Sequence, residues 1–260
     1  KIASSELLMT IKTGAMMSTY QGKLSMSETE ALNTAMPINI VNRLIGNPTR
    51  NYINFLLPGM MLAIVQVAVA MNAASSRIVK KSSGIIDFFK NVMKNLIDYG
   101  ILGIVSAVLI LAVQHYIFDV PIKASYTSVI LLLIVFMLAV VSMSLLIASI
   151  FSKKQVFATQ VAAVWFIPSS ILSGYSWPLI SMPDFFRQIS SFMPYTYFVS
   201  TLRNLMLKGH SYDYKTNIAM LIILTLGSLI LSLVSFVIRK QILKRNITLK
   251  SLSGRKVLHD

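Results

Sequence analysis

The sequence predicts an all-α integral membrane protein whose helices form a polytopic bundle. Hydrophobic residues make up 55% of the 260 residues and charged residues only 13%, whereas a soluble domain carries about 25% charged residues. The mean hydropathy is +0.69. Five apolar runs reach about 20 residues, which is the length that an α-helix needs to cross the hydrocarbon of a bilayer. We therefore expect five membrane spans.

Residues 1–52 precede the first apolar run and are predicted to be the end of a larger outer domain. Within 1–36, apolar side chains such as Ile2, Leu7 and Ile11 recur at roughly helical spacing. A helix that lies on the membrane surface is the alternative interpretation of this segment.

The predicted spans lie in a transmembrane domain of residues 53–245, which a basic cytoplasmic tail, 246–260, follows. They cover about 53–74, 96–118, 126–151, 155–174 and 216–238. Proline has no N–H group and distorts a helix, so Pro58, next to Gly59, and Pro168 predict kinks. A gating hinge at each kink is the functional interpretation.

Polar side chains within the spans are mostly uncharged. Gln66 and Gln160, with Trp165, are the residues that we assign to a substrate path. The alternative role for such side chains is hydrogen bonding between helices.

Lysine and arginine predict the orientation, because short cytoplasmic loops are rich in these residues. They gather in segments 75–95 and 152–154 and from Arg239 onward, whereas 119–125 and 175–215 balance basic with acidic residues. The net charge of +15 fits cytoplasmic loops that face anionic lipid rather than nucleic acid. A cytoplasmic C-terminus and five spans place residues 1–52 outside. We therefore expect an upstream span, making six in the full protein, and a sequence that is a fragment.

Residues 175–215 are too apolar for an ordinary loop and too interrupted by proline for a span. Non-helical backbone at membrane depth is tolerated only where protein or a water-filled cavity surrounds it. We expect short re-entrant or interface-parallel helices that form an outer cap. Aromatic residues such as Tyr195 suit the membrane interface, so a lipid-anchoring belt is a second interpretation that is compatible with the first. The cap contains Trp177, Pro178, Pro183 and Pro194.

No catalytic or metal site is predicted on this chain. It has no cysteine, and His115, His210 and His259 lie far apart in the sequence. It has no phosphate-binding loop, and its spans contain almost no ionisable residue, which argues against an ion-coupled carrier. We expect no enzyme activity and no cofactor on this chain.

Two motifs resemble bacterial ABC-2 type transporter permeases. "NPTRNYINFLLPGMM" (47–61) is similar to the entry into their second span, and "SGYSWPLISMPDFFRQISSFMPYTYFVSTLRNLML" (173–207) is similar to their outer signature. The resemblance covers about residues 40–245 and includes the order of the spans. In this subtype a first span and a large outer domain precede five spans, which agrees with the upstream span expected from charge.

The resemblance implies a homodimeric or heterodimeric, multi-pass permease of the bacterial inner membrane. It implies export of a lipid, drug, polysaccharide or peptide by alternating access, driven by two cytoplasmic ATPase subunits that hold ATP and Mg²⁺. It also implies that the segment of about 83–95 is a coupling helix that docks on the ATPase. Asp87, Phe88 and Phe89 would lie at the exposed turn of that helix, with Lys90 beside them.

The same segment supports a second hypothesis. A helical wheel places Ile85, Phe89 and Leu96 on an apolar side and Asp87 and Lys90 on the other. The family commonly shows "RE.GT.E" here, whereas this chain has "RIVKKSSGIIDFF" (77–89), without the Glu after Arg or the Thr after Gly. In a non-transporting scaffold or surface receptor with the same architecture, this basic helix would lie on anionic lipid.

Overall fold

The structure is a computed structural model. It describes the backbone of residues 2–24, 27, 52–177 and 179–256, and the side chains of 11–22, 27, 54–177 and 179–242. The chain divides into two compact units, Lys1–Leu44 and Ile45–Asp260, and each is described by itself.

The first unit contains helix α1 (Ile2–Leu24), in agreement with the helical spacing of its sequence. Its described side chains form no core: Ile11 is 62% exposed, and Ser18 and Thr19 donate hydrogen bonds to the carbonyl of Ala15 one turn earlier. The remainder of the predicted outer segment, residues 25–26 and 28–51, lies outside the described part of the chain.

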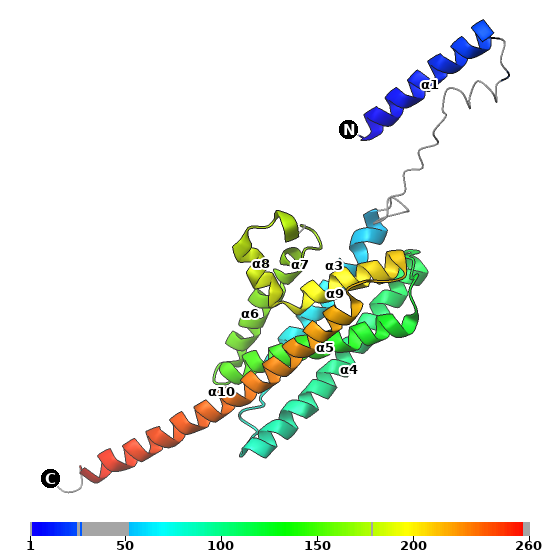
Figure 1. The fold of residues 1–260 in the computed structure, drawn as a ribbon. Helices are drawn as coiled ribbons and strands as arrows, with labels where there is room; N and C mark the ends of the chain where they lie inside the picture. Colours follow the sequence, from blue (N-terminus) through cyan, green and yellow to red (C-terminus); the bar gives the residue numbers. More distant parts are fainter. Residues whose placement is uncertain (1, 25–26, 28–51, 178, 257–260) are drawn as a thin grey trace. The chain divides into compact units, whose positions relative to one another are not determined.

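The second unit is a helical bundle (Figure 1). Its five segments that are long and apolar enough to cross a membrane are Asn54–Ala74, Ile85–Ile117, Tyr126–Ile150, Gln155–Leu172 and Tyr214–Ile242. They confirm the predicted polytopic helical membrane protein. The helices are α3 (Tyr52–Ala74), α4 (Ile85–Ile117), α5 (Tyr126–Ile150), α6 (Gln155–Phe166), α7 (Ser169–Leu172), the 3₁₀ helix η1 (Leu179–Ser181), α8 (Asp184–Ser191), α9 (Pro194–Lys208) and α10 (Tyr214–Lys256).

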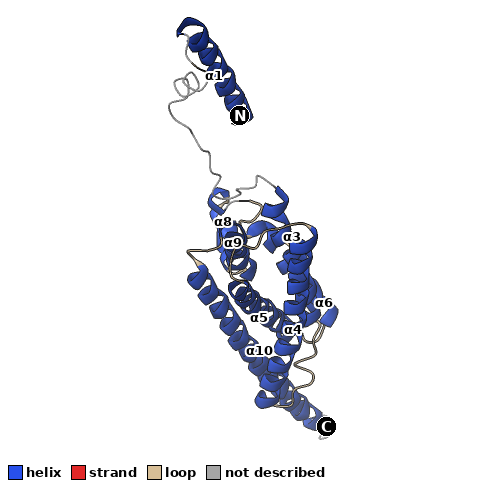
Figure 2. Ribbon diagram, turned by 90° about the vertical axis from the view of Figure 1, so that its right-hand side faces the viewer, coloured by secondary structure: helices blue, strands red, loops and turns tan. Residues whose placement is uncertain are grey.

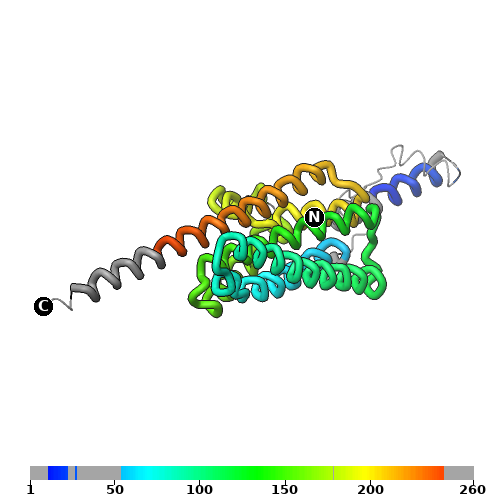
Figure 3. The backbone as a smooth tube through the Cα atoms, turned by 90° about the horizontal axis from the view of Figure 1, so that it is seen from below, coloured from blue at the N-terminus to red at the C-terminus, as the bar shows by residue number. Residues whose placement is uncertain are grey.

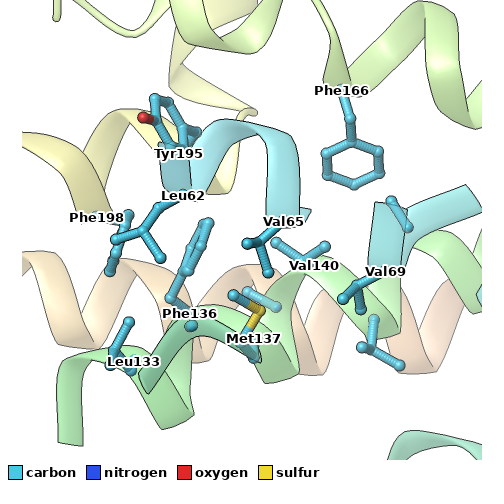
Figure 4. Packing of buried hydrophobic residues seen from close by; sticks show 14 of the residues in the cluster. Leu62, Val65, Val69, Leu133, Phe136, Met137, Val140, Phe166, Tyr195 and Phe198 are labelled. Carbon is cyan, nitrogen blue, oxygen red and sulfur yellow. The ribbon is translucent and has the colours of Figure 1, made fainter. Parts of the chain in front are cut away.

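Helix α5 is the centre of the bundle. It packs against α3, α4, α6, α9 and α10, and it lies alongside α10 over most of its length (Figures 1 and 2). Seen from below, α3 and α4 run beside each other and beside α5 (Figure 3). Leu133, Phe136, Met137 and Val140 of α5 form the middle of the core (Figure 4). The ring of Phe136 stacks on Phe198 of α9 with centroids 3.8 Å apart, so α9 is part of the bundle rather than a peripheral loop.

The loops gather at two chemically different ends. We call one the basic end: it comprises loops 75–84 and 151–154, the first turns of α4, and Arg239 and Lys240 of α10. Side chains join these parts, since Arg77 donates to Gln155 (3.1 Å), Gln155 to the Ser75 carbonyl (3.1 Å) and Lys240 to the Ser83 carbonyl (2.7 Å). We call the other the aromatic end: it comprises residues 118–125 and 173–213.

Helix α4 differs from the prediction. The expected separate amphipathic helix of about 83–95 is instead the first three turns of one continuous 33-residue helix, Ile85–Ile117. No proline interrupts 85–117, so nothing separates the amphipathic turns from the span. Its buried residues recur every three or four positions: Phe88, Val92, Leu96, Gly100, Gly103, Ala107, Leu111 and Gln114.

The aromatic end contains short helices, as expected. Between spans four and five lie η1, α8 and the longer α9. Helix α10 begins at Tyr214 and its backbone stays helical through Lys256, so the predicted tail from 246 onward continues this helix as far as it is described. The sixth span and the outer domain expected upstream stay predictions.

Candidate functional site

The proline-containing turn of α3, at Pro58, is bound by a tyrosine from the aromatic end. The Tyr175 hydroxyl accepts a hydrogen bond from the Gly59 N–H (3.1 Å) and donates one to the Phe55 carbonyl (2.5 Å). Phe55 and Gly59 are the two partners of one helical turn, because a helical N–H donates to the carbonyl four residues earlier. The hydroxyl therefore bridges both polar groups of the turn that contains proline.

Gly59 is the residue that lets Tyr175 approach. A Cβ at this position would lie 2.4 Å from Cε1 and Cζ of Tyr175, which no side chain could occupy. From the other side, the fully buried Tyr195 of α9 donates its hydroxyl to the Gly59 carbonyl (2.5 Å). Two tyrosines thus bind the N–H and the carbonyl of one glycine.

Arg203 of α9 completes this cluster. Its guanidinium lies 4.3 Å from the ring centroid of Phe55 and 4.2 Å from that of Tyr175, and it donates to the Tyr175 carbonyl (3.1 Å). Burial lowers the pKa of Arg203 and raises the pKa of Tyr175 and of Tyr195 above their ordinary values. The tyrosines therefore stay protonated and able to donate. We call Phe55, Gly59, Tyr175, Tyr195 and Arg203 the tyrosine clamp.

The second predicted hinge, Pro168, is also held by a side chain from another helix. The helix is interrupted between α6 and α7, at Ile167 and Pro168. The Phe166 carbonyl beside the interruption accepts hydrogen bonds from Ser169 Oγ (2.6 Å) and from Gln66 Nε2 of α3 (3.4 Å). Gln66 also donates to Ser169 Oγ (2.5 Å). Both distorted turns therefore bind side chains that come from a neighbouring segment.

The structure does not bring the three predicted substrate-path residues together. Gln66 is fully buried in the α3–α6–α7 contact, where it has the hydrogen-bonding role that was the alternative. Trp165 donates its indole N–H to Met143 Sδ of α5 (3.1 Å). Gln160 is exposed on the surface of α6, and no side-chain partner is described for it.

The predicted outer-cap residues are spread over the aromatic end. Trp177 is 45% exposed, Pro183 precedes α8, and Pro194 is buried at the first turn of α9; Pro178 lies outside the described residues. Tyr195, expected at the membrane interface, is instead buried against Gly59.

The sequence alone assigned no role to Tyr175 or Arg203. The one signal for them was that both lie in the 173–207 motif, which resembles the outer signature of ABC-2 permeases. Among the described residues, no three His, Asp or Glu side chains could hold one metal ion.

The predicted coupling residues divide between a buried and an exposed set. The expectation that Phe88 is exposed is wrong: it is 1% exposed and stacks on Phe236 of α10, with ring centroids 4.3 Å apart. The side chain of Phe89, the next residue, is 58% exposed, and Lys90 beside it is also exposed. Asp87 accepts a hydrogen bond from Ser83, which precedes the helix.

A family model described as "ABC-2 family transporter protein" matches residues 2–234 of this chain. The chain belongs to the ABC-2 transporter family. This result confirms the family resemblance of the two motifs.

Three relatives each match about two thirds or more of this chain but about half or less of their own length. An ABC transporter G family member 20 of Dictyostelium discoideum is 33% identical over 202 residues, which are 74% of this chain and 27% of the relative. The probable multidrug ABC transporter permease YbhS of Escherichia coli K12 is 30% identical over 211 residues, 77% of this chain and 53% of the relative. YbhR of the same organism, with the same description, is 23% identical over 66% of this chain and 48% of its own length. No solved structure matches the chain.

The ABC-2 chain therefore spans at most about half the length of these relatives. The described bundle nevertheless includes both matched motifs from Asn54 onward, and the tyrosine clamp is what joins them, since Phe55 and Gly59 come from the first motif and Tyr175, Tyr195 and Arg203 from the second.

Substitution of Gly59 by Ala should destabilise this bundle, because the added Cβ overlaps the Tyr175 ring. Overpacking typically costs about 1–3 kcal/mol. Gly227→Ala in α10 is the matched control, since nothing lies within 4 Å of its Cβ position. It should be neutral or stabilising by up to about 1 kcal/mol, as Ala favours helix over Gly. Thermal unfolding of the purified protein in mild detergent measures both.

The Tyr175→Ala background separates the overlap from any other effect of Gly59→Ala. With the ring removed, Gly59→Ala should no longer lower the unfolding temperature. An equal loss in both backgrounds would show that the tyrosine contact is not the reason for glycine at this position.

Proposed function

We propose that this chain forms a five-span part of the permease subunit of an ATP-driven exporter, with its basic end in the cytoplasm. The observation that carries the proposal is the exposed apolar start of α4, on a helix that continues without a break into the membrane. Family membership and the five spans support the permease role.

The charge distribution supports the orientation. At the basic end, Asp87 and Asp98 are the described acidic residues, whereas the aromatic end balances basic residues with Asp119, Asp184 and Asp213. Cytoplasmic loops carry the excess of lysine and arginine. The basic residues of the basic end are Arg77, Lys80, Lys81, Lys90, Lys94, Lys153, Lys154, Arg239 and Lys240.

The first turns of α4 have the properties of a docking surface for an ATPase subunit. Ile85, Ile86 and Phe89 are 52%, 71% and 58% exposed in the turns that adjoin the loop 75–84. Three large apolar side chains on one short segment outside the predicted span of 96–118 favour contact with a protein surface. ATP and Mg²⁺ would be held by that partner.

A displacement of this surface would move several helices. Phe88 stacks on Phe236 and Lys240 donates to the Ser83 carbonyl, so α10 is joined to the start of α4. The loop that precedes α4 is joined to α6 by Arg77 and Gln155. A force on the start of α4 would therefore reach α6, whose break at Pro168 is bound to α3 by Gln66. This is a physical basis for alternating access.

The exposed face of α6 is the proposed lining of the export path at an interface with a second permease copy. Gln160 lies on it between Val156 and Val164, which are 75% and 74% exposed. A glutamine without a partner is unfavourable against hydrocarbon, so protein or a water-filled cavity should cover this face. An apolar lining with few fixed charges suits a lipid-like or drug cargo, in line with the description of the E. coli relatives as multidrug permeases; a polysaccharide or peptide is the alternative cargo.

Phe89→Ala should abolish co-purification of the ATPase without changing the unfolding temperature, because the Phe89 side chain is 58% exposed. Phe88→Ala should instead lower the unfolding temperature, since truncating a buried phenylalanine costs about 3–5 kcal/mol. Quantification of proteins that accompany the tagged permease in mild detergent, with thermal unfolding of each variant, checks both expectations.

Phe185→Ala is the matched control, because Phe185 is 66% exposed at the aromatic end. It should leave the ATPase bound. An ATPase that stays with Phe89→Ala contradicts the docking surface. A wild-type preparation with no ATPase would favour the scaffold or receptor hypothesis, which the atypical sequence of 77–89 supports.

Gln160→Cys should react with a water-soluble maleimide in intact membranes at least several-fold faster than Ile101→Cys. These 260 residues contain no cysteine, so each substitution introduces the one thiol of this part of the protein. Ile101 is 57% exposed on α4 and should face lipid, where no reactive thiolate forms. Equally slow labelling of the two positions would contradict a water-filled path along α6.

A further inference from the structure

A groove lies between the end of α5 and the second half of α10, at the basic end. Its volume is about 580 Å³, and its apolar lining consists of Leu146, Ile150, Leu231, Val234, Ile238 and Ile242. Lys153 and Arg239 also line it. A second cavity of about 240 Å³ shares Ile150, Lys153 and Arg239 with the groove and adds Lys154. The two cavities therefore meet at one cluster of three cations.

The dimensions of the groove match one leaflet of a bilayer. Leu231, Val234, Ile238 and Ile242 follow one face of α10. With a rise of 1.5 Å per residue this face extends roughly 16 Å, which is about half of the hydrocarbon thickness of about 30 Å. Leu231, Val234, Ile238 and Ile242 are all about half exposed, so the groove is open to its surroundings.

Arg239 is held in place by the end of α5. Its guanidinium donates to the Ile150 carbonyl (2.5 Å) and to Ser152 Oγ. A cation at the last carbonyls of a helix is favourable, because that end carries a partial negative charge. The exposed Lys153 and Lys154 follow directly in the chain.

These three positive charges have no acidic partner among the side chains that the structure describes. Among the described side chains, no carboxylate forms an ion pair with Lys153, Lys154 or Arg239. An occupant of this site would therefore need an apolar part about one leaflet long and an anionic group at one end. A free anion would leave the groove unfilled, and a neutral lipid would leave the three cations unpaired.

We infer that this groove binds an anionic phospholipid. Its phosphate is bound by Lys153, Lys154 and Arg239, and one acyl chain lies along Ile150 of α5 and Leu231–Ile242 of α10. The inference depends on the chain spanning a membrane and not on an ATPase partner. The lipid would join α5 and α10, which share the most extensive contact of the bundle. It would do so at the end where Phe236 of α10 also stacks on Phe88 in the first turn of α4.

Native mass spectrometry of the purified protein in mild detergent tests the inference. Phosphatidylglycerol should bind more tightly than phosphatidylcholine with the same acyl chains. Near an anionic lipid each lysine contributes about fivefold in affinity, so Lys153→Gln with Lys154→Gln should weaken phosphatidylglycerol binding about 25-fold. Replacement of both lysines by Arg should restore it.

The matched control is Lys80→Gln with Lys81→Gln, which removes two exposed adjacent lysines of the same end. This pair should change phosphatidylglycerol binding less than twofold. An equal loss in both double variants would overturn the inference in favour of a general charge effect, and equal binding of the two lipids would overturn the anionic preference.

Two further measurements test the acyl groove and the source of the anion. Ser235→Trp fills the groove without changing charge, and it should weaken phosphatidylglycerol binding while phosphate contacts remain possible. Inorganic phosphate at millimolar concentration should not raise the unfolding temperature, whereas phosphatidylglycerol should. Stabilisation by phosphate to the same extent, or full binding by Ser235→Trp, would show a head-group site without the groove.

Discussion

The bundle depends on the rule that a polar backbone group inside a membrane needs a partner in the protein. Water is absent from the hydrocarbon, so a turn disturbed by proline is stable only where another segment satisfies it. Tyr175 meets this need at Phe55 and Gly59, and Gln66 and Ser169 meet it at Phe166. Each proline-containing turn is consequently bound to a different part of the chain, so a change in the geometry of either turn must break these contacts or move the bound segment with it.

Helix α5 provides the contrast. It contains neither proline nor glycine, and its Ser142 and Ser144 donate to carbonyls of the same helix, Ala139 and Val140. These serines are thus satisfied within the helix. The hydrogen bonds that the α5 backbone accepts from α10, from Tyr214 to the Ser128 carbonyl and from Arg239 to the Ile150 carbonyl, lie at its two ends. Helix α3, which contains Pro58, and helix α6, which ends just before Pro168, pack on α5.

The two ends of the bundle are stabilised in different ways. At the aromatic end, the rings of Phe55 and Tyr175 stack on each other and Arg203 lies against both rings. The tyrosine hydroxyls there bind backbone groups. At the basic end, Arg239 and Lys240 bind carbonyls of loops and helix ends rather than carboxylates. Carbonyl partners orient these cations without neutralising them. The basic end thus keeps a net positive charge that anionic lipid or a partner surface can meet.

The sequence by itself determined the class of protein, the five spans and the segregation of charge, because span length and lysine content reflect the solvent around each segment. It also showed the positions of Pro58 and Pro168. Only the tertiary structure decided that Phe88 is buried and Phe89 exposed, that Gln66 is paired and Gln160 is not, and that Tyr195 lies inside the bundle. The reason is physical: lipid is as apolar as a packed neighbour, so along a span hydrophobic periodicity does not distinguish the face that packs from the face that meets lipid.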